Sequence, residues 1–422
     1  MNHIPIVVLM LGLFSSAAAA SGDFFAALDQ MISAEKDSLV SIRRQLHANP
    51  ELSNREFETA KFIAGHLRSL GLEPREGVAK TGVVAIIQGG KPGPCILLRS
   101  DMDALPINET TNLPFCSRNP GVMHACGHDI HMTVLLGAAT VLTKMRNELQ
   151  GSVKIVFQPA EEGAPAGEEG GASLMIKEGV FDNPPVTAAF ALHVDPLLDV
   201  GNVALRAGSD MANGDIFQIT IEGKRSHGAW PHLGIDPIPI AAQIVLEFQT
   251  LMARTQDALK PAVLSTCIIE GGNRWNILAG SVHLSGTVRT LDAAQRDDIK
   301  TRMEKIVQAN CSAFGTTYVF NYARTAPMVV NDPTIAKRAR GILESALGEE
   351  HVRESPAQMI AEDFGYFTER VPSLYFHLGV RNEKLGMTAP VHSDLFKADE
   401  NSIPVGVKAV CSLALGYPAS TP

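Results

Sequence analysis

Residues 121–131 read Gly-Val-Met-His-Ala-Cys-Gly-His-Asp-Ile-His, a stretch rich in side chains that bind metals. Three histidines, one cysteine and one aspartate fall within eight positions, from His124 to His131. Imidazole, thiolate and carboxylate are the protein groups that hold zinc and related divalent ions. Cys126 and His128 flank a glycine, and in an extended backbone side chains two residues apart point the same way. The stretch therefore predicts a metal site that both side chains face.

The cysteines of the chain, at positions 95, 116, 126, 267, 311 and 411, form no Cys-x-x-Cys pair and no disulfide framework. Cys116 and Cys126 are close enough in sequence to pair, and this alternative stays open. A thiolate bound to two cations is instead deprotonated and occupied. In that case Cys126 is a ligand, and neither a nucleophile nor half of a disulfide.

Four further polar clusters lie just past predicted strands. They are RSDMDALP at 99–106, QPAEEG at 158–163, ALHVD at 191–195 and APVHSDLF at 389–396. In open α/β sheets, ligands gather at the carboxyl ends of the strands. Alone, each cluster is weak evidence: a histidine such as His193 at a strand end is more often structural, and paired glutamates usually form a solvated turn. Together they fit a two-metal hydrolytic site, which needs about four to six ligands, one of them bridging, and a separate carboxylate as base.

The elements that must position these clusters alternate between strands and helices. Amphipathic helices are predicted at 24–46 and 56–70. Strands at 82–88, 95–101, 152–160 and 187–194 then alternate with helices at 133–149 and 172–181. This order is typical of the α/β class, with a mostly parallel sheet that has helices on both faces.

The pattern changes near residue 208. A half-exposed strand at 215–224, a helix at 237–254, strands at 262–272 and 281–290, and a helix at 293–313 follow, and the order is that of a small α+β, ferredoxin-like domain. The earlier style returns after residue 325, with a helix at 333–346, a strand at 373–379 and a helix at 402–415. We therefore expect a catalytic domain of residues 21–209 and 326–422, interrupted by an inserted domain at 210–325.

Composition narrows the function and the location. The chain has 422 residues, a formal net charge of −9 and no basic clusters, which argues against nucleic acid and anionic membranes and favours a small soluble substrate. Residues 4–14 form an apolar run, followed by Ser-Ser-Ala-Ala-Ala-Ala at 15–20. This is typical of a signal peptide, residues 1–20, and predicts export to the periplasm or beyond. The run is too short to span a membrane.

The motifs taken together resemble a known family. They are RSDMDALPINE, GVMHACGHDIH, FQPAEEG, GGASLMI, HGAWPHLGIDPI, GTVRT, AEDFGYF and VHSDLF. In this order, across essentially the whole mature chain, they resemble the aminoacylase and carboxypeptidase superfamily of metallopeptidases. The likeness is to its amidohydrolase branch, which contains hippurate hydrolases, N-acyl-amino-acid deacylases and auxin-conjugate hydrolases. The resemblance implies an enzyme that cleaves the amide bond of N-acyl or N-aroyl amino acids with a metal-activated water.

The resemblance also implies two divalent metal ions per subunit, zinc in the first place, with manganese, cobalt or nickel as alternatives. The implied ligands are Cys126 as the bridge, Glu162 and His392 on one ion, and His128 and His193 on the other. Glu161 is implied as the general base, which takes a proton from the water and later delivers it to the leaving amine. Asp101 is implied as the carboxylate that orients a metal-bound imidazole. For Asp103, turn and cap hydrogen bonds are an equally good interpretation.

In the inserted domain, the segment GKRSHGAWPH implies that His227 reaches an active site and stabilises the oxyanion, often in the partner subunit. Asn276 and Arg289 match substrate-holding positions, and Arg289 suits a carboxylate. An ion pair on the strand surface is an alternative of equal weight for Arg289. The resemblance further implies a homodimer formed through the inserted domain.

The chain departs from the family pattern at three places. Residues 223–227 read Gly-Lys-Arg-Ser-His where the family has Gly-Lys-Gly-Gly-His, and residues 276–279 read Asn-Ile-Leu-Ala where it has Asn-x-Ile-Pro. The usual lysine before Gly121 is absent. These changes leave the metal set intact and the substrate preference open. Two other functions were weighed: a dipeptidase or carboxypeptidase acting on short peptides, and a non-catalytic subunit that binds acyl amino acids, for which the base Glu161 would have no use.

Overall fold

The computed structural model describes residues 12–419, so the first eleven residues of the predicted signal peptide lie outside the described part. The chain forms two compact units. The first comprises the chain up to Leu205, Thr334–Glu354 and the part from Phe376 onward. The second comprises Arg206–Pro333 and Ser355–Tyr375. The predicted insertion, 210–325, lies within the second unit, which also includes residues 355–375.

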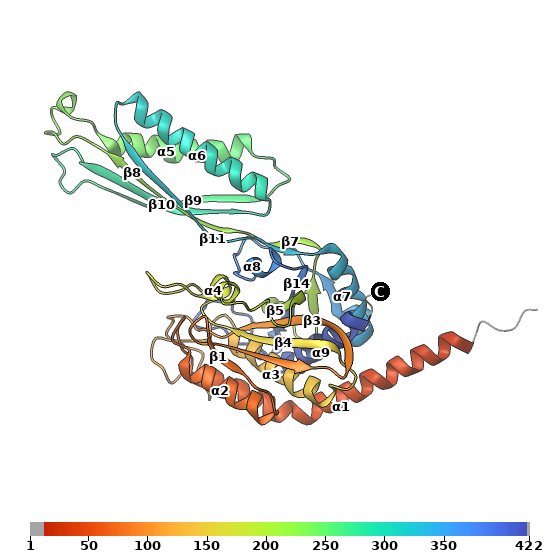
Figure 1. The fold of residues 1–422 in the computed structure, drawn as a ribbon. Coiled ribbons are helices and arrows are strands. Elements are labelled where there is room, and N and C mark those ends of the chain that lie inside the picture. Colours follow the sequence, from red (N-terminus) through yellow and green to blue (C-terminus); the bar gives the residue numbers. More distant parts are fainter. Residues whose placement is uncertain (1–11, 420–422) are drawn as a thin grey trace, which may run out of the picture. The chain divides into compact units, whose positions relative to one another are not determined.

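The first unit is built on an eight-stranded sheet (Figure 1). In spatial order its strands are β1 (Arg75–Val78), β2 (Gly82–Gln88), β4 (Gln150–Gln158), β3 (Lys91–Asp101), β5 (Val186–Asp199), β14 (Ser373–Arg381), β6 (Val203–Leu205) and β13 (Val352–Glu354). The central strands β4, β3 and β5 are parallel, as is the outer pair β6–β13. Strand β2 runs antiparallel to β1 and β4, and β14 antiparallel to β6. The sheet therefore has a parallel centre with antiparallel additions.

Helices cover both faces of this sheet. They are α1 (Gly12–Ala48), α2 (Phe57–Ser69), α3 (His128–Lys144), α4 (Gly171–Lys177), α7 (Pro333–Leu347) and α9 (Ser402–Ala419). Helices α1, α3 and α9 pack against one another, and α3 and α9 lie on β3, whereas α4 packs on β4 from the other side (Figure 1). Every residue of α3 from His128 to Leu142 is buried, as expected for a helix that is apolar on all sides. The predicted α/β class is confirmed. Helix α3 is closely packed, and it begins at His128, within the stretch of predicted metal donors.

The second unit contains a separate sheet with two long helices. In chain order its main elements are β8 (Gly214–Glu222), α5 (Pro237–Thr255), β9 (Ala262–Gly271), β10 (Ser281–Thr290), α6 (Ala293–Ala313) and β11 (Tyr318–Ala326). The spatial order is β11-β8-β10-β9, and all three pairings are antiparallel. This is the ferredoxin-like arrangement that the sequence order predicted. Its role as a lid or dimerisation domain stays a prediction.

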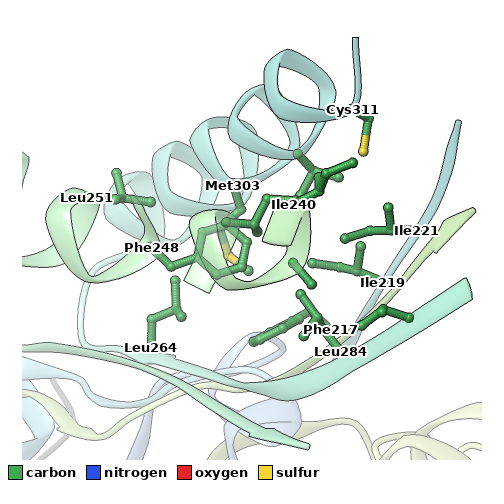
Figure 2. Packing of buried hydrophobic residues seen from close by; sticks show 14 of the residues in the cluster. Phe217, Ile219, Ile221, Ile240, Phe248, Leu251, Leu264, Leu284, Met303 and Cys311 are labelled. Carbon is green, nitrogen blue, oxygen red and sulfur yellow. The ribbon is translucent and has the colours of Figure 1, made fainter. Parts of the chain in front are cut away.

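The core of the second unit lies between one face of this sheet and the two helices (Figure 2). Phe217 of β8 and Phe248 of α5 meet edge to face, with ring centroids 5.9 Å apart. At the base of the unit, the buried carboxylate of Asp215 accepts hydrogen bonds from Arg296 Nε at 2.9 Å and Tyr322 Oη at 2.6 Å. A buried carboxylate needs such partners, because desolvation otherwise penalises its charge.

Several shorter elements escaped prediction. They are β1, β6, β13, β7 (Gly208–Met211), β12 (Val329–Asn331), α8 (Gly365–Thr368) and three 3-10 turns, at Pro231–Leu233, Glu349–His351 and Glu383–Leu385. Strands β7 and β12 pair with each other in the second unit. Segments of three or four residues carry too little periodicity to be recognised. Among the described residues, no helix combines the length and the apolar character that crossing a bilayer requires.

Candidate metal centre

The five predicted metal donors all belong to the first unit. Cys126 lies in the turn before α3, His128 is the first residue of α3, Glu162 follows β4, His193 lies in β5 and His392 lies in the loop after β14. Glu162 lies beyond the carboxyl end of the parallel strand β4. Cys126 and His128 lie at the start of α3, the helix that follows β3 in the chain. The structure thus brings together residues that are up to 266 positions apart in the chain.

The sulfur of Cys126 is the centre of this cluster. His193 Nε2 and His392 Nε2 each lie 3.3 Å from Cys126 Sγ. Glu162 Oε1 lies 3.2 Å from His392 Nε2. Two groups of donors share the sulfur, one with His128 and His193 and the other with Glu162 and His392, and within each group the ligand atoms lie within 4.8 Å of one another. All six cysteines are free, so the alternative pairing of Cys116 with Cys126 is wrong.

The backbone between Cys126 and His128 is not extended, and that expectation is wrong. Gly127 has φ 86° and ψ 15°, in the left-handed region, and α3 starts directly after it. A Cβ at this glycine would lie 2.5 Å from Val194 Cγ2, so no larger residue fits without displacement. The two side chains reach the same centre through a tight turn into a helix.

The donor set fits divalent cations. His128 Nε2 is buried and has no hydrogen-bond partner in the described part of the chain. The buried Glu162 Oε1 has a polar neighbour 3.2 Å away, His392 Nε2, which is itself a predicted donor. Burial, followed by the charges of Glu162 and Glu161, raises the pKa of the Cys126 thiol well above its usual value. Cations beside the sulfur would reverse this, because they compensate the carboxylates and favour the thiolate.

Two ring orientations agree with a ligand role. His128 Nδ1 lies 2.8 Å from the main-chain oxygen of Asp103, and His193 Nδ1 lies 2.7 Å from that of Val194. A ring nitrogen facing a carbonyl oxygen must carry the hydrogen and donate it, so in the neutral ring Nε2 keeps its lone pair. In both histidines, the nitrogen that faces the cluster is therefore the one able to bind a metal.

Asp101 contacts a different histidine from the one expected. Its Oδ1 lies 2.6 Å from Nδ1 of His131, which is outside the predicted ligand set, and its Oδ2 lies 3.8 Å from His128 Nε2. The main-chain N–H of Val194 donates to His131 Nε2 at 2.9 Å. Burial opposes ionisation of Asp101, but the charges of His128, His131 and Arg99 outweigh it and hold its pKa well below the usual range. Asp101 thus orients His131, which supports the backbone next to His193.

The turn that carries Glu161 and Glu162 is held by a second carboxylate after β3. The N–H of Glu161 donates to Asp103 Oδ1 at 3.1 Å, and that of Glu162 donates to Asp103 Oδ2 at 3.0 Å. Ser53 Oγ donates to the same carboxylate at 2.7 Å. Asp103 thus makes the turn and cap hydrogen bonds that the alternative interpretation expected. The N–H groups that it binds belong to the two glutamates of the site.

Glu56, just before α2, completes this support and was not predicted. The N–H of Ala160 donates to Glu56 Oε1 at 3.0 Å, and Thr81 Oγ1 donates to Oε2 at 2.6 Å. Burial and the charge of Asp103 raise the pKa of Glu56 to about 7. The signal available in the sequence was weak: a glutamate after Pro-Glu-Leu-Ser-Asn-Arg, between two helices. Only the fold places it beneath the turn at 160–162.

Glu161 lies beside the donors without belonging to either group around Cys126. Its Oε2 is 4.0 Å from His128 Nε2, and its side chain is 9% exposed. A carboxylate in this place, close to metal-binding atoms and reached by little solvent, can hold a proton that a nearby water gives up.

The other three predicted site residues belong to the second unit. His227 and Asn276 lie on two loops joined by a hydrogen bond from the N–H of Gly228 to the oxygen of Asn276, 2.8 Å long. Arg289 is half-buried on β10, and burial lowers the pKa of its guanidinium although Asp215 opposes the effect. The neighbouring Asp215 carboxylate is paired with Arg296 instead, and no side-chain hydrogen bond or ion pair of Arg289 is found within the described residues. This speaks against the strand-surface ion pair.

Imidazole and carboxylate donors around one cysteine sulfur, in an α/β unit that a ferredoxin-like unit interrupts, match what a metal-dependent hydrolase requires. The chain belongs to the peptidase family M20/M25/M40, whose model matches residues 97–416. The family and the enzyme class expected from the motifs are thereby confirmed.

Similar proteins cover nearly the whole chain. Thermostable carboxypeptidase 2 of Saccharolobus solfataricus is 40% identical over 384 residues, 90% of this chain and 96% of its own length. N-acetyl-L-cysteine deacetylase of Bacillus subtilis is 38% identical over 372 residues, 88% of this chain and 86% of its own. The crystal structure of the YXEP protein of Bacillus subtilis, a dinuclear metal binding peptidase from the M20 family, superposes with a TM-score of 0.81 at 33% identity. It covers 92% of this chain and 99% of that one.

Proposed function

We propose that the protein hydrolyses the amide bond of N-acyl amino acids with two divalent metal ions, zinc in the first place. The observation that carries this proposal is the pair of donor groups sharing Cys126, with the carboxylate of Glu161 next to them. Similarity to a deacetylase of an N-acyl amino acid supports the substrate class. Cys126, Glu162 and His392 would hold one ion, and Cys126, His128 and His193 would hold the other.

The metal ions, when bound, would polarise the substrate carbonyl and make a water acidic enough to lose a proton near neutral pH. Glu161 takes that proton as the water oxygen attacks the carbonyl carbon. It then delivers the proton to the nitrogen as the C–N bond breaks, so that a carboxylate and a free amino acid leave. Asp103 and Glu56 keep the turn in place during both transfers, because they hold its backbone N–H groups.

The second unit would supply the remaining contacts. His227 would donate a hydrogen bond to the carbonyl oxygen as negative charge develops on it. Arg289, whose guanidinium has no partner in the described chain, would bind the carboxylate of the amino acid, with Asn276 as a further polar contact. Family membership and the exposed position of His227 support these roles.

A substrate panel tests the proposal. Metal-free protein is reloaded with zinc, manganese, cobalt or nickel and assayed on N-acetyl amino acids, N-benzoylglycine and dipeptides. We expect metal-dependent release of amino acid from the N-acyl compounds. Metal-replete protein that binds acyl amino acids without cleaving any amide would favour the non-catalytic binding subunit instead.

A carboxypeptidase or dipeptidase is the second candidate, supported by the 40% identity to thermostable carboxypeptidase 2. The same donors and base would serve either reaction, because both break a C–N amide bond with water. A kcat/KM for dipeptides above that for every N-acyl amino acid would establish this candidate.

We further propose that the protein is exported and forms a homodimer through the second unit. The apolar run and alanine block of residues 4–20 support export. The edge strand β9, with Ile268 and Ile269 45% and 57% exposed, supports self-association, because exposed apolar edges favour pairing. Sequencing the N-terminus of mature protein and measuring its mass by light scattering test the two proposals.

A further inference from the structure

Two loops at one end of the second unit form a single hydrogen-bonded surface, here called the loop pair: residues 224–235 and 272–279. The first loop closes on itself through two hydrogen bonds between Lys224 and Ile235, of 2.9 and 3.0 Å. It is joined to the second loop by the Gly228–Asn276 bond described above and by the N–H of Leu278, which donates to the oxygen of Ser226 at 3.0 Å. The position of one loop therefore fixes that of the other.

The only two tryptophans of the chain lie in this loop pair, one on each loop. Trp230 is 58% exposed and Trp275 is 91% exposed. Tryptophan normally buries most of its large surface, whereas the aromatic rings of the same unit's core, Phe217 and Phe248, are fully buried (Figure 2). Single exposed apolar residues need no explanation, but both tryptophans together on one bonded surface indicate a binding role.

The same loops carry polar groups suited to an anionic ligand. Residues 224–235 and 272–279 contain Lys224, Arg225 and Arg274 and no acidic residue. Arg225 and Arg274 are exposed, and no side-chain hydrogen bond or ion pair is found for them within the described residues. The Oδ1 atom of Asn276, next to Trp275, is buried without a hydrogen-bond partner there. Flat aromatic faces beside unpaired cations complement a compound with an aromatic group and a carboxylate.

We propose that Trp230 and Trp275 bind the acyl group of the substrate and select aromatic acyl groups over short aliphatic ones. The inference rests on the proposed function, in which His227 of the same loop contacts the substrate. The imidazole of His227 lies 5.4 Å from the ring of Trp230, centroid to centroid, and Trp275 directly precedes Asn276. An acyl group bound against the two indoles would thus lie next to the residues that contact the scissile amide.

Steady-state kinetics on the metal-loaded protein tests this assignment. We expect Trp230→Ala and Trp275→Ala each to raise KM for N-benzoylglycine about tenfold, the range seen when a pocket loses an apolar contact. KM for N-acetylglycine and both kcat values should stay within about twofold. Trp275→Phe should restore most of the preference, because a phenyl ring still stacks. Leu259→Ala is the matched control, since Leu259 is 90% exposed in the same unit, in the loop before β9.

Fluorescence gives a second readout, because each single substitution to phenylalanine leaves one tryptophan. In a Glu161→Gln background, which binds ligand without consuming it, N-benzoylglycine should change the emission of both single-tryptophan proteins. Equal losses on both substrates, or no loss on either, would overturn the assignment while leaving the proposed function intact. Dissociation of a dimer in Trp275→Ala, or binding of wild type to phosphatidylcholine vesicles, would assign the surface to another occupant. Failure of wild-type protein to cleave any N-acyl amino acid would overturn both proposals.

Discussion

The metal-donor cluster of the first unit and the loop pair of the second unit present their side chains in opposite ways. Around Cys126, the donors His128 and His193 and the turn of Glu161 are fixed by buried or partly buried hydrogen bonds to two backbone oxygens and one carboxylate. On the loop pair, two indoles and two guanidinium groups project into solvent. Metal geometry tolerates small errors only, so Cys126 and His128 are buried and the donor side chains are held by hydrogen bonds, although His392 is exposed. Side chains that select a ligand can be exposed in the free protein, because the bound ligand covers them.

The largest effect is expected from removing the shared sulfur. Cys126→Ser replaces a thiolate by a hydroxyl that stays protonated at neutral pH and is a poor bridge between cations. We expect the metal content per subunit, measured by atomic emission, to fall by at least one ion and activity to fall with it. Cys267→Ser is the control, since Cys267 is exposed on β9. Unchanged metal content in Cys126→Ser would show that the sulfur is not a shared metal ligand, and the contrast between the two regions would then be wrong.

Replacing the proposed base should separate chemistry from metal binding. In Glu161→Gln, kcat should fall by roughly a hundredfold to ten-thousandfold, the usual contribution of a general base. The metal content should stay at the wild-type level, whereas in Glu162→Gln it should fall. If Glu161→Gln lost metal as well, Glu161 would be a ligand and its assigned role would be wrong.

The support beneath the turn at 160–162 should matter less than the base but remain measurable. Glu56→Ala leaves the N–H of Ala160 and the hydroxyl of Thr81 buried without an acceptor, which costs about 1–3 kcal/mol. We expect kcat to fall about tenfold with little change in KM. Glu56→Gln should restore it, because its amide oxygen can accept from Ala160 and its amide group can donate to Thr81. Glu58→Gln, 78% exposed on the same helix, is the neutral control.

The smallest effect concerns pH and His47, on α1. Burial disfavours its protonation, but the charge of Asp129 and hydrogen bonds to Asp129 and Glu109 outweigh burial and raise the pKa of His47 above its ordinary value. The raised pKa adds stability that is complete below the unfolded value, about 6.5, and is lost as pH rises through the folded value.

The free energy of unfolding in urea should show this dependence. The difference between wild type and His47→Gln should be larger at pH 6 than at pH 9. His351→Gln, on the protein surface, should show no such change. A difference independent of pH would mean that folding leaves the pKa of His47 unchanged, and a smaller difference at pH 6 than at pH 9 would mean that folding lowers it.

Much of the fold could be predicted because periodicity is local. Strand β2 and helix α6 have the predicted bounds, 82–88 and 293–313, since alternating or amphipathic runs there end at clear breaks. The donors were named through the family resemblance that their motifs carry together, because each cluster alone is weak evidence. The residues that support the donors could not be predicted. Glu56 binds Ala160 across 104 positions, and the sequence around one residue contains no signal for the other. The motif also did not show that the chain turns at Gly127, because glycine adopts positive and negative φ angles about equally well.

Gly127 also sets a limit on how this protein can change. Because a methyl group there would press on Val194, next to His193, one added carbon would disturb donors from a helix and from a neighbouring strand together. In a library randomised across 124–131, position 127 should return glycine almost without exception among active clones, whereas Ile130, which is buried but is not a donor, should accept other apolar residues. Gly127, which carries no side chain, should therefore be as restricted as the donors Cys126 and His128 on either side of it.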